Sequence, residues 1–185
     1  MGLEIERKFL VASFDWQALT PNRVMRFRQG YLAIGGGPED LPETRVRLSE
    51  PLDGAASASP VAYLTVKGQG SRTRQEIEFE IPKAQAEDLL GMCAGRTLLK
   101  DRYVIPFGGL DWEVDVYRGP LEGLVVAEVE LPSEDYDLVL PNWVGREVSD
   151  DKSFKNARLA ISRWTGCGLA ARQEQPASKP RGPGA

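Results

Sequence analysis

Charged side chains recur at every second position in several short segments of the sequence. The first segment is Glu4-Ile5-Glu6-Arg7-Lys8, and similar pairs and triplets follow along the chain. Because residues i and i+2 lie on one face of a strand, each row points in one direction. Basic rows suit a polyanion, since arginine binds phosphate oxygens bidentately and lysine acts as a point charge. Acidic rows would repel that anion unless divalent cations lie between the two sets.

These rows are nearly balanced in charge, with nine acids and eight bases. The acids are Glu4, Glu6, Glu76, Glu78, Glu80, Glu113, Asp115, Glu128 and Glu130, and the bases are Lys8, Arg45, Arg47, Lys67, Arg72, Arg74, Lys100 and Arg102. Acids and bases that line one cavity imply a metal–polyphosphate complex. The expected reaction is in-line attack on a phosphoryl group by a metal-activated water.

The chain contains no histidine. This removes imidazole as a general base, as a zinc ligand and as a member of a catalytic triad. A metal must therefore bind to oxygen ligands, which favours Mg²⁺, Mn²⁺ or Ca²⁺, and a carboxylate must position or deprotonate the water. Cys93 and Cys167 have neither metal-binding spacing nor a disulfide framework. Cys93 lies in an apolar helical stretch and is expected to be a buried structural thiol.

Length and composition predict one soluble domain at residues 1–166, followed by a disordered tail at 167–185. The net charge of −4 argues against bulk binding of nucleic acid. No leader-like start or transmembrane stretch is present, so we expect a cytoplasmic protein without a membrane partner. No organic cofactor is expected.

Period-two alternation predicts eight strands, at about 2–11, 23–34, 44–49, 62–67, 72–81, 97–106, 110–118 and 124–131. Helical periodicity appears at 82–94 and 153–164, and a short helix fits 15–19. In the second of these helices, Phe154, Ala157, Ile161 and Trp164 form an apolar stripe that is expected to pack on the barrel or close one mouth. The region 51–60 is rich in Gly, Ala and Ser and predicts a mobile hairpin loop.

Two arrangements explain the charged rows. On any one strand, a charged row is most simply the solvated face of a half-exposed sheet. Across seven strands, long acidic and long basic pairs in place of Ser, Thr, Asn and Gln favour a shared interior. We therefore expect an α+β protein: a closed eight-stranded antiparallel β-barrel with a charged lumen, its apolar exterior covered by the two helices.

The sequence closely resembles the CYTH superfamily, the triphosphate tunnel metalloenzymes, over about residues 1–165. The hallmark is the N-terminal Glu-x-Glu-x-Lys strand, here Glu4 to Lys8. Further matching motifs follow in order: Gln29-Gly30-Tyr31-Leu32, Arg45-Val46-Arg47, Leu64-Thr65-Val66-Lys67-Gly68, Arg74-Gln75-Glu76-Ile77-Glu78, Lys100-Asp101-Arg102-Tyr103, Trp112-Glu113-Val114-Asp115, Ala127-Glu128-Val129-Glu130-Leu131, Glu147-Val148-Ser149-Asp150 and Asn156-Ala157-Arg158-Leu159-Ala160.

The resemblance implies specific roles. Glu4, Glu6, Glu128 and Glu130 would hold catalytic Mg²⁺ or Mn²⁺, assisted by Asp115 or Glu113. Lys8, Arg45, Arg47, Lys67, Lys100 and Arg102 would bind the triphosphate, with Lys8 also belonging to the catalytic set. Arg74, Glu76 and Glu78 look like lumen residues that bind phosphate, order a second metal or orient neighbours. Tyr31 matches a tyrosine that faces the tunnel, with plain packing as an equal alternative.

The resemblance is strongest to the compact inorganic triphosphatases, which implies hydrolysis of tripolyphosphate to pyrophosphate and phosphate. Class IV adenylate cyclases and thiamine or nucleoside triphosphatases share the fold and remain alternatives. A polyphosphate-binding module without turnover is the non-enzyme alternative, although a pure anion binder gains nothing from the carboxylates. The expected partner is a small-molecule triphosphate, and a homodimer is allowed.

Overall fold

The computed structural model describes residues 5–35, 42–52, 59–68 and 76–162. Within these residues, nine strands form one antiparallel sheet in the order β5-β4-β3-β2-β6-β7-β8-β1-β9. The strands are β1 (Ile5–Val11), β2 (Arg23–Ala33), β3 (Glu43–Pro51), β4 (Val61–Lys67), β5 (Glu76–Ile81), β6 (Thr97–Phe107), β7 (Leu110–Arg118), β8 (Val125–Leu131) and β9 (Val144–Glu147).

Each of the eight predicted strands is present in the described residues. The predicted number of strands is wrong because the sheet contains a ninth, and the prediction that the sheet closes into a barrel is also wrong. The ninth strand, β9, pairs with β1 through Phe9 opposite Glu147 and Val11 opposite Val144. It thus occupies the edge of β1 that a closed barrel would offer to β5. In the described part of the chain the sheet begins at β5 and ends at β9, without a ladder between these edges.

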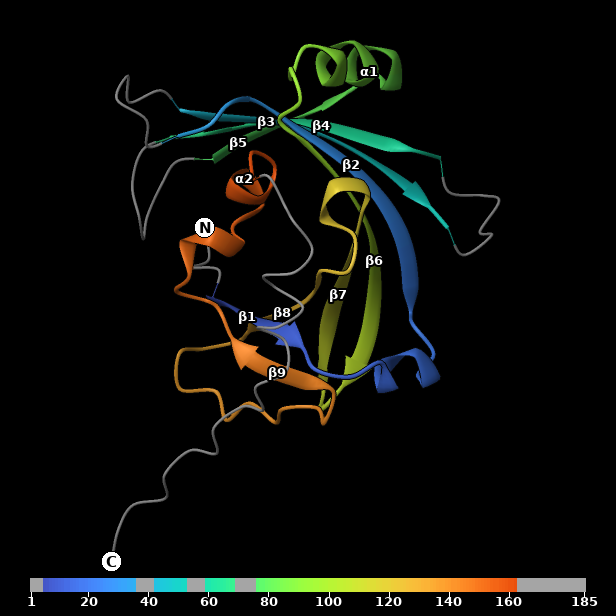
Figure 1. Cartoon of the computed structure of the whole chain (residues 1–185), viewed down its shortest axis with the longest axis vertical. Coiled ribbons are helices and arrows are strands. Elements are labelled where there is room, and N and C mark those ends of the chain that lie inside the picture. The colour runs from blue at the N-terminus through green and yellow to red at the C-terminus, as the bar shows by residue number, and fades with distance from the viewer. Residues whose placement is uncertain (1–4, 36–41, 53–58, 69–75, 163–185) are drawn as a thin grey trace, which may run out of the picture.

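The C-terminal helix predicted at 153–164 is also wrong in extent and place. It is divided into a 3₁₀ turn η3 (Lys152–Phe154) and a short helix α2 (Asn156–Leu159), because Lys155 has extended backbone with φ −68° and ψ 135°. Figure 1 shows α2 inside the curve of the sheet, not on its exterior. Ile161, expected on the buried stripe, is 46% exposed.

The concave face of the sheet is apolar at the end where η3 and α2 pack. Phe154, Ala157 and Leu159 from these turns are buried. Their partners from the strands continue the charged rows in the period-two pattern: Leu10 follows Lys8, Leu98 precedes Lys100, Tyr117 follows Asp115 and Val126 precedes Glu128. The predicted charged lumen is therefore charged at one end only, because the other end is a hydrophobic core.

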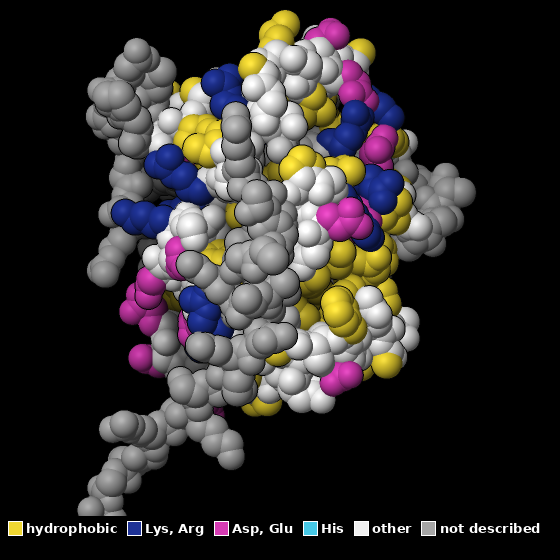
Figure 2. Space-filling model, viewed as in Figure 1, with side chains coloured by type: hydrophobic (Ala, Val, Ile, Leu, Met, Phe, Trp, Pro, Cys, Tyr) yellow, Lys and Arg dark blue, Asp and Glu magenta, His cyan; other side chains and the backbone are white. Residues whose placement is uncertain are grey.

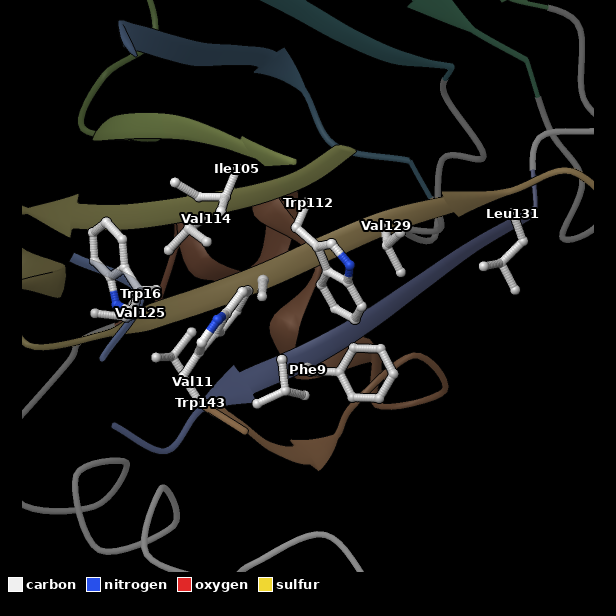
Figure 3. Close-up of a cluster of buried hydrophobic side chains, with 12 residues drawn as sticks. Phe9, Val11, Trp16, Ile105, Trp112, Val114, Val125, Val129, Leu131 and Trp143 are labelled. Atoms are coloured by element: carbon white, nitrogen blue, oxygen red, sulfur yellow. The ribbon is translucent and has the colours of Figure 1, made fainter. Parts of the chain in front are cut away.

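The convex face is covered by different elements on its two sides. Helix α1 (Lys83–Gly91) packs on β2, β3 and β4, where Val46, Leu48 and Ala62 are buried. On the other side, Trp112 stands on the outer face of the sheet and contacts Trp143 edge-on at 5.6 Å (Figure 3). This cover comes from the 3₁₀ turn η1 (Asp15–Ala18), residues 132–143 and β9, so helices cover only part of the exterior.

The rest of the surface is mixed in character. Beside α1 and β2, Lys and Arg side chains lie next to Asp and Glu side chains (Figure 2), as in the Arg28–Glu87 pair between these elements. The 3₁₀ turn η2 (Gly119–Leu121) joins β7 to β8. Over the described residues, none of the helices is both long and apolar enough to span a bilayer. The predictions for the 167–185 tail and for most of the 51–60 loop concern positions outside the described residues.

Candidate functional site

A cavity of about 800 Å³ occupies the charged end of the concave face. The described charged residues that line it are seven basic and seven acidic: Lys8, Arg23, Arg45, Arg47, Lys67, Lys100 and Arg102, with Glu6, Glu76, Glu78, Asp111, Glu113, Glu128 and Glu130. The charges balance, as the sequence predicted, and they come from both halves of the chain. The cavity is thus lined by charged groups of both signs, some buried and some exposed to solvent.

Strand register brings the distant rows together. Across β1 and β8, Glu6 lies opposite Glu130 and Lys8 lies opposite Glu128. Across β6 and β7, Arg102 lies opposite Asp115. Directly opposite residues on antiparallel strands have their Cβ atoms about 5 Å apart. The register alone therefore explains why residues more than 100 positions apart share one site.

Arg102 is the centre of the ion-pair network. Its guanidinium donates to Asp115 from Nε and Nη2, each at 2.7 Å, and from Nη2 to Glu128 at 2.8 Å. It also bonds to Glu113. Burial alone would lower the pKa of Arg102, but these three carboxylates together raise it well above its usual value. Asp115 is fully buried and pairs with both Arg102 and Lys100, so these two cations balance its charge in the wall formed by β1, β6, β7 and β8.

Two lysines complete this wall. Nζ of Lys8 lies 2.6 Å from Oε1 of Glu128 and 3.8 Å from Oε1 of Glu6. Burial would lower the pKa of Lys8, but Glu128 outweighs it and the pKa is raised. Lys100 is buried and bonds to Asp115; burial and then Arg102 lower its pKa.

The two carboxylates beside Lys8 differ in proton affinity. Burial, and then the nearby charge of Glu128, raise the pKa of Glu6 to about 6. Burial acts in the same direction on Glu128, but Lys8, Lys100 and Arg102 outweigh it and lower its pKa to about 2. Near pH 6, Glu128 is therefore ionised while Glu6 still exchanges its proton.

The opposite wall is formed by β3, β4 and β5. Arg45 donates from Nη2 to Oγ1 of Thr65 at 3.1 Å, and Thr65 donates in turn to Glu78 at 2.7 Å. Lys67 pairs with Glu76 at 2.6 Å. Nε of Arg45 is buried without a hydrogen-bond partner in the described residues. A buried donor of this kind at a cavity wall favours an anionic ligand.

The donor set fits a hard divalent cation. Glu6, Glu128 and Glu130 offer only oxygen atoms and meet through the β1–β8 register. The ammonium of Lys8 already lies between Glu6 and Glu128, which shows that this place accepts positive charge. Among the described residues, no group of three or more Asp, Glu or Cys side chains is already arranged to hold a metal ion. Both carboxylate oxygens of Asp115 are held by Lys100 and Arg102, and its predicted metal role stays a prediction.

Some predicted residues lie elsewhere. Tyr31 is 2% exposed within the apolar end, and its hydroxyl accepts a hydrogen bond from Nε2 of Gln29 at 2.5 Å. Burial raises the pKa of Tyr31. This environment favours the packing alternative for Tyr31. Glu4 and Arg74, together with Arg72, lie outside the described residues.

Sequence reasoning missed several residues at the site. Asn156 and Gln29 line the cavity, and both belong to motifs that were recognised without a role for these side chains. Arg23 and Asp111 also line it: Arg23 stands alone in its register at the start of β2, whereas Asp111 continues the row of Glu113 and Asp115, and this spacing could have found it. Phe27 was missed because its register on β2 carries no charged row; its neighbours there are Met25 and Gln29. An aromatic residue in the lumen-facing register of a charged wall was the signal that could have found it.

Comparisons with known proteins identify the family of the chain. The model of the CYTH domain matches residues 2–157. An inorganic triphosphatase of Acetivibrio thermocellus is 37% identical over 161 residues, covering 86% of this chain and 94% of that protein. Another, of Nitrosomonas europaea, is 39% identical over 163 residues, covering 86% and 97%. A crystal structure of the inorganic triphosphatase NE1496 superposes with a TM-score of 0.63 at 36% identity, covering 88% and 97%. The chain belongs to the CYTH domain family.

Proposed function

We propose that the protein is a divalent-metal-dependent inorganic triphosphatase that hydrolyses tripolyphosphate to pyrophosphate and phosphate. The observation that carries this proposal is the cavity with basic side chains on both walls, together with the carboxylates of Glu6, Glu128 and Glu130 that the β1–β8 register brings together on one wall. Two relatives that match almost their whole length are named inorganic triphosphatases. The balanced charge fits a substrate that arrives as a metal–anion complex.

The basic residues of the two walls would bind different parts of the triphosphate. Arg45, Arg47 and Lys67 reach the cavity from β3 and β4, and Lys8, Lys100 and Arg102 reach it from β1 and β6. Arg102 is held by three carboxylates, so it stabilises the wall as well as any bound phosphate. Arg45 and Arg47 have weaker partners, with Glu78 at 3.4 and 3.9 Å. Their guanidinium groups are therefore the freer of the described donors for phosphate oxygens.

Glu6, Glu128 and Glu130, with Glu4, would hold Mg²⁺ or Mn²⁺. When bound, the ion activates a water and neutralises charge on the phosphate oxygens. Glu6 loses its proton near pH 6, so a cation displaces that proton easily. The ammonium of Lys8 pairs with Glu6 and Glu128. Once a metal ion neutralises these carboxylates, the ammonium would be free to bind a phosphate oxygen instead. Glu76 and Glu78 lie on the far wall, where a second ion or a structural pairing with Lys67 and Arg45 are both consistent with the contacts.

The proposed activity is tested by identifying the products as well as measuring the rate of reaction. Purified protein is incubated with tripolyphosphate, ATP and thiamine triphosphate in Mg²⁺ or Mn²⁺, and phosphate and cyclic AMP are quantified. We expect phosphate release to be fastest from tripolyphosphate and to stop with chelator. Cyclic AMP as the dominant product from ATP would instead identify a cyclase. Tight binding of tripolyphosphate without any hydrolysis would identify a binding module.

A variant checks the metal role directly. Glu6→Ala should abolish metal-dependent hydrolysis while it leaves tripolyphosphate binding in place, because the cations of both walls remain. The exposed Glu134, which lies outside the cavity, offers a matched control as Glu134→Ala. Unchanged hydrolysis in Glu6→Ala would contradict the role. The expectations of a cytoplasmic location and of a homodimer remain predictions.

A further inference from the structure

The side chain of Phe27 lies against three cations of the cavity wall. The guanidinium carbons of Arg47 and Arg102 are each 5.5 Å from the ring centroid, and Nζ of Lys100 is 5.7 Å from it. All three distances are within the range of cation–π attraction. One aromatic ring therefore serves three of the basic side chains that line the cavity.

The position of Phe27 in the sheet explains this geometry. Strand β2 lies between β3 and β6, and Phe27 stands directly opposite Lys100 on β6 and Ser49 on β3. Arg47 projects from the β3 side and Arg102 from the β6 side. Between its ends, the lumen register of β2 carries the uncharged side chains of Met25, Phe27 and Gln29. The two basic sets thus meet across a strand that offers no carboxylate to separate them.

We propose that Phe27 is a positioning residue that holds Arg47, Lys100 and Arg102 in place for a triphosphate; this rests on the function proposed above. The face of the ring attracts cations through its quadrupole and carries no net charge. A carboxylate at the same place would also gather the cations, but it would repel the substrate phosphates. The cavity lining includes the three cations and not Phe27, so the ring acts through them and not on the substrate.

The experiment varies the ring electronics at constant shape. Mono-, di- and trifluorophenylalanine are incorporated at position 27, because each fluorine weakens the attraction of the ring face for cations. We expect the KM for tripolyphosphate to rise stepwise with fluorine number, toward a roughly three- to tenfold increase in Phe27→Leu. Phe27→Tyr, which keeps the ring face, should stay near the native KM. A KM that does not follow fluorine number, or an equal loss in Phe27→Tyr and Phe27→Leu, would overturn the proposal.

A second measurement separates this inference from the proposed function. The ring of Phe27 shields nearby protons, so the side-chain NMR signals of Arg47, Arg102 and Lys100 should shift in Phe27→Leu without any ligand. Phe79→Leu is the matched control, since Phe79 is 55% exposed on the other face of β5. If the native protein hydrolyses no triphosphate, the proposed function fails, but the shifts still test the placement. Unshifted signals in Phe27→Leu would overturn the placement itself.

Discussion

The hydroxyl of Tyr117 donates a hydrogen bond to Oδ1 of Asn156 at 2.5 Å, and so ties β7 to the first residue of α2. Tyr117 is 1% exposed and packs in the apolar end of the concave face, whereas Asn156 lines the cavity. The bond stands at the boundary between the two ends. It joins β7, whose Glu113 lines the charged end, to the segment that fills the apolar end.

Removing Asn156 and removing the hydroxyl of Tyr117 should lower the free energy of unfolding by different amounts. Asn156→Ala leaves a buried tyrosine hydroxyl without a partner, which costs about 1–3 kcal/mol. Tyr117→Phe leaves a half-buried amide that water can reach, so the loss in free energy of unfolding should be smaller. Urea titrations of both variants and of the double variant measure this. A loss in Tyr117→Phe as large as that in Asn156→Ala would contradict the assignment.

Arg102 and Arg47 should respond to substitution in opposite ways. Arg102→Ala removes the cation that Asp115, Glu113 and Glu128 share and leaves buried Asp115 with Lys100 alone, so it should cost about 3 kcal/mol of stability. Burial, and then repulsion by Arg45, lower the pKa of Arg47, so Arg47→Ala should leave the stability of the free protein unchanged or higher. Its loss should instead raise the KM for tripolyphosphate about ten- to hundredfold.

These two variants are best compared in one experiment, by thermal unfolding and by steady-state kinetics. Arg102→Lys adds a control, because lysine keeps the charge but lacks the fork that reaches Asp115, Glu113 and Glu128 together. We expect Arg102→Lys to remain destabilised. Destabilisation of Arg47→Ala to the level of Arg102→Ala would refute the division of roles.

The raised pKa of Glu6 predicts a defined pH dependence. The native pKa of about 6 exceeds the ordinary value of 4.5, so the folded protein binds more protons than the unfolded chain between these values. Stability in chelator should therefore fall as pH rises from about 4.5 to 6, as far as Glu6 is concerned. Glu6→Gln should flatten this segment of a plot of Tm against pH. Glu128 acts at lower pH: its pKa of about 2 predicts a loss of stability as pH falls below 4.5.

The raised pKa of Glu6 also predicts how metal binding depends on pH. Because a cation must displace the proton of Glu6 below about pH 6, the apparent affinity for Mn²⁺ should weaken as pH falls through this value. Calorimetry in buffers of different ionisation enthalpy would detect the released proton. Proton release that is the same in native protein and in Glu6→Gln would show that another group is responsible.

Gly30 should not tolerate a side chain. A Cβ at this position would lie 2.5 Å from Sγ of Cys93 and 3.1 Å from Cδ2 of Leu90, both on the α1 side of the sheet. Gly30→Ala should therefore cost about 1–3 kcal/mol. In a Cys93→Ala background the nearest atom is absent, and the same substitution should cost less. Equal costs in the two backgrounds, measured by urea unfolding, would show that the clash is relieved elsewhere.

The sequence predicted the strands well because period two survives in each of them. It missed β9, which has four residues and contributes only two register pairs to β1. Because β9 occupies the edge at which a barrel would close, the open sheet could not be predicted without this strand. The apolar stripe that includes Phe154 and Ala157 is real, and both residues are buried. The break at Lys155 depends on how the segment fits inside the curved sheet, which periodicity does not encode.

The candidate site was predictable to the extent that charge repeats along a strand. The rows on β1, β3, β6, β7 and β8 do line one cavity with balanced charge. Alternation says nothing about where a row ends, so the apolar half of the concave face was not foreseen. Uncharged contributors such as Asn156 and Phe27 depend on contacts across the sheet, between residues far apart in the sequence.

The unpaired edges of the sheet have a mechanical consequence. A closed barrel fixes its diameter through a continuous backbone ladder. Here the wall of β3–β5 is joined to the wall of β6, β7, β8 and β1 through β2 alone in the described sheet, so β2 can serve as a hinge. Because β5 and β9 do not pair with each other in the described sheet, the backbone does not fix the distance between Arg45 on one wall and Lys8 on the other.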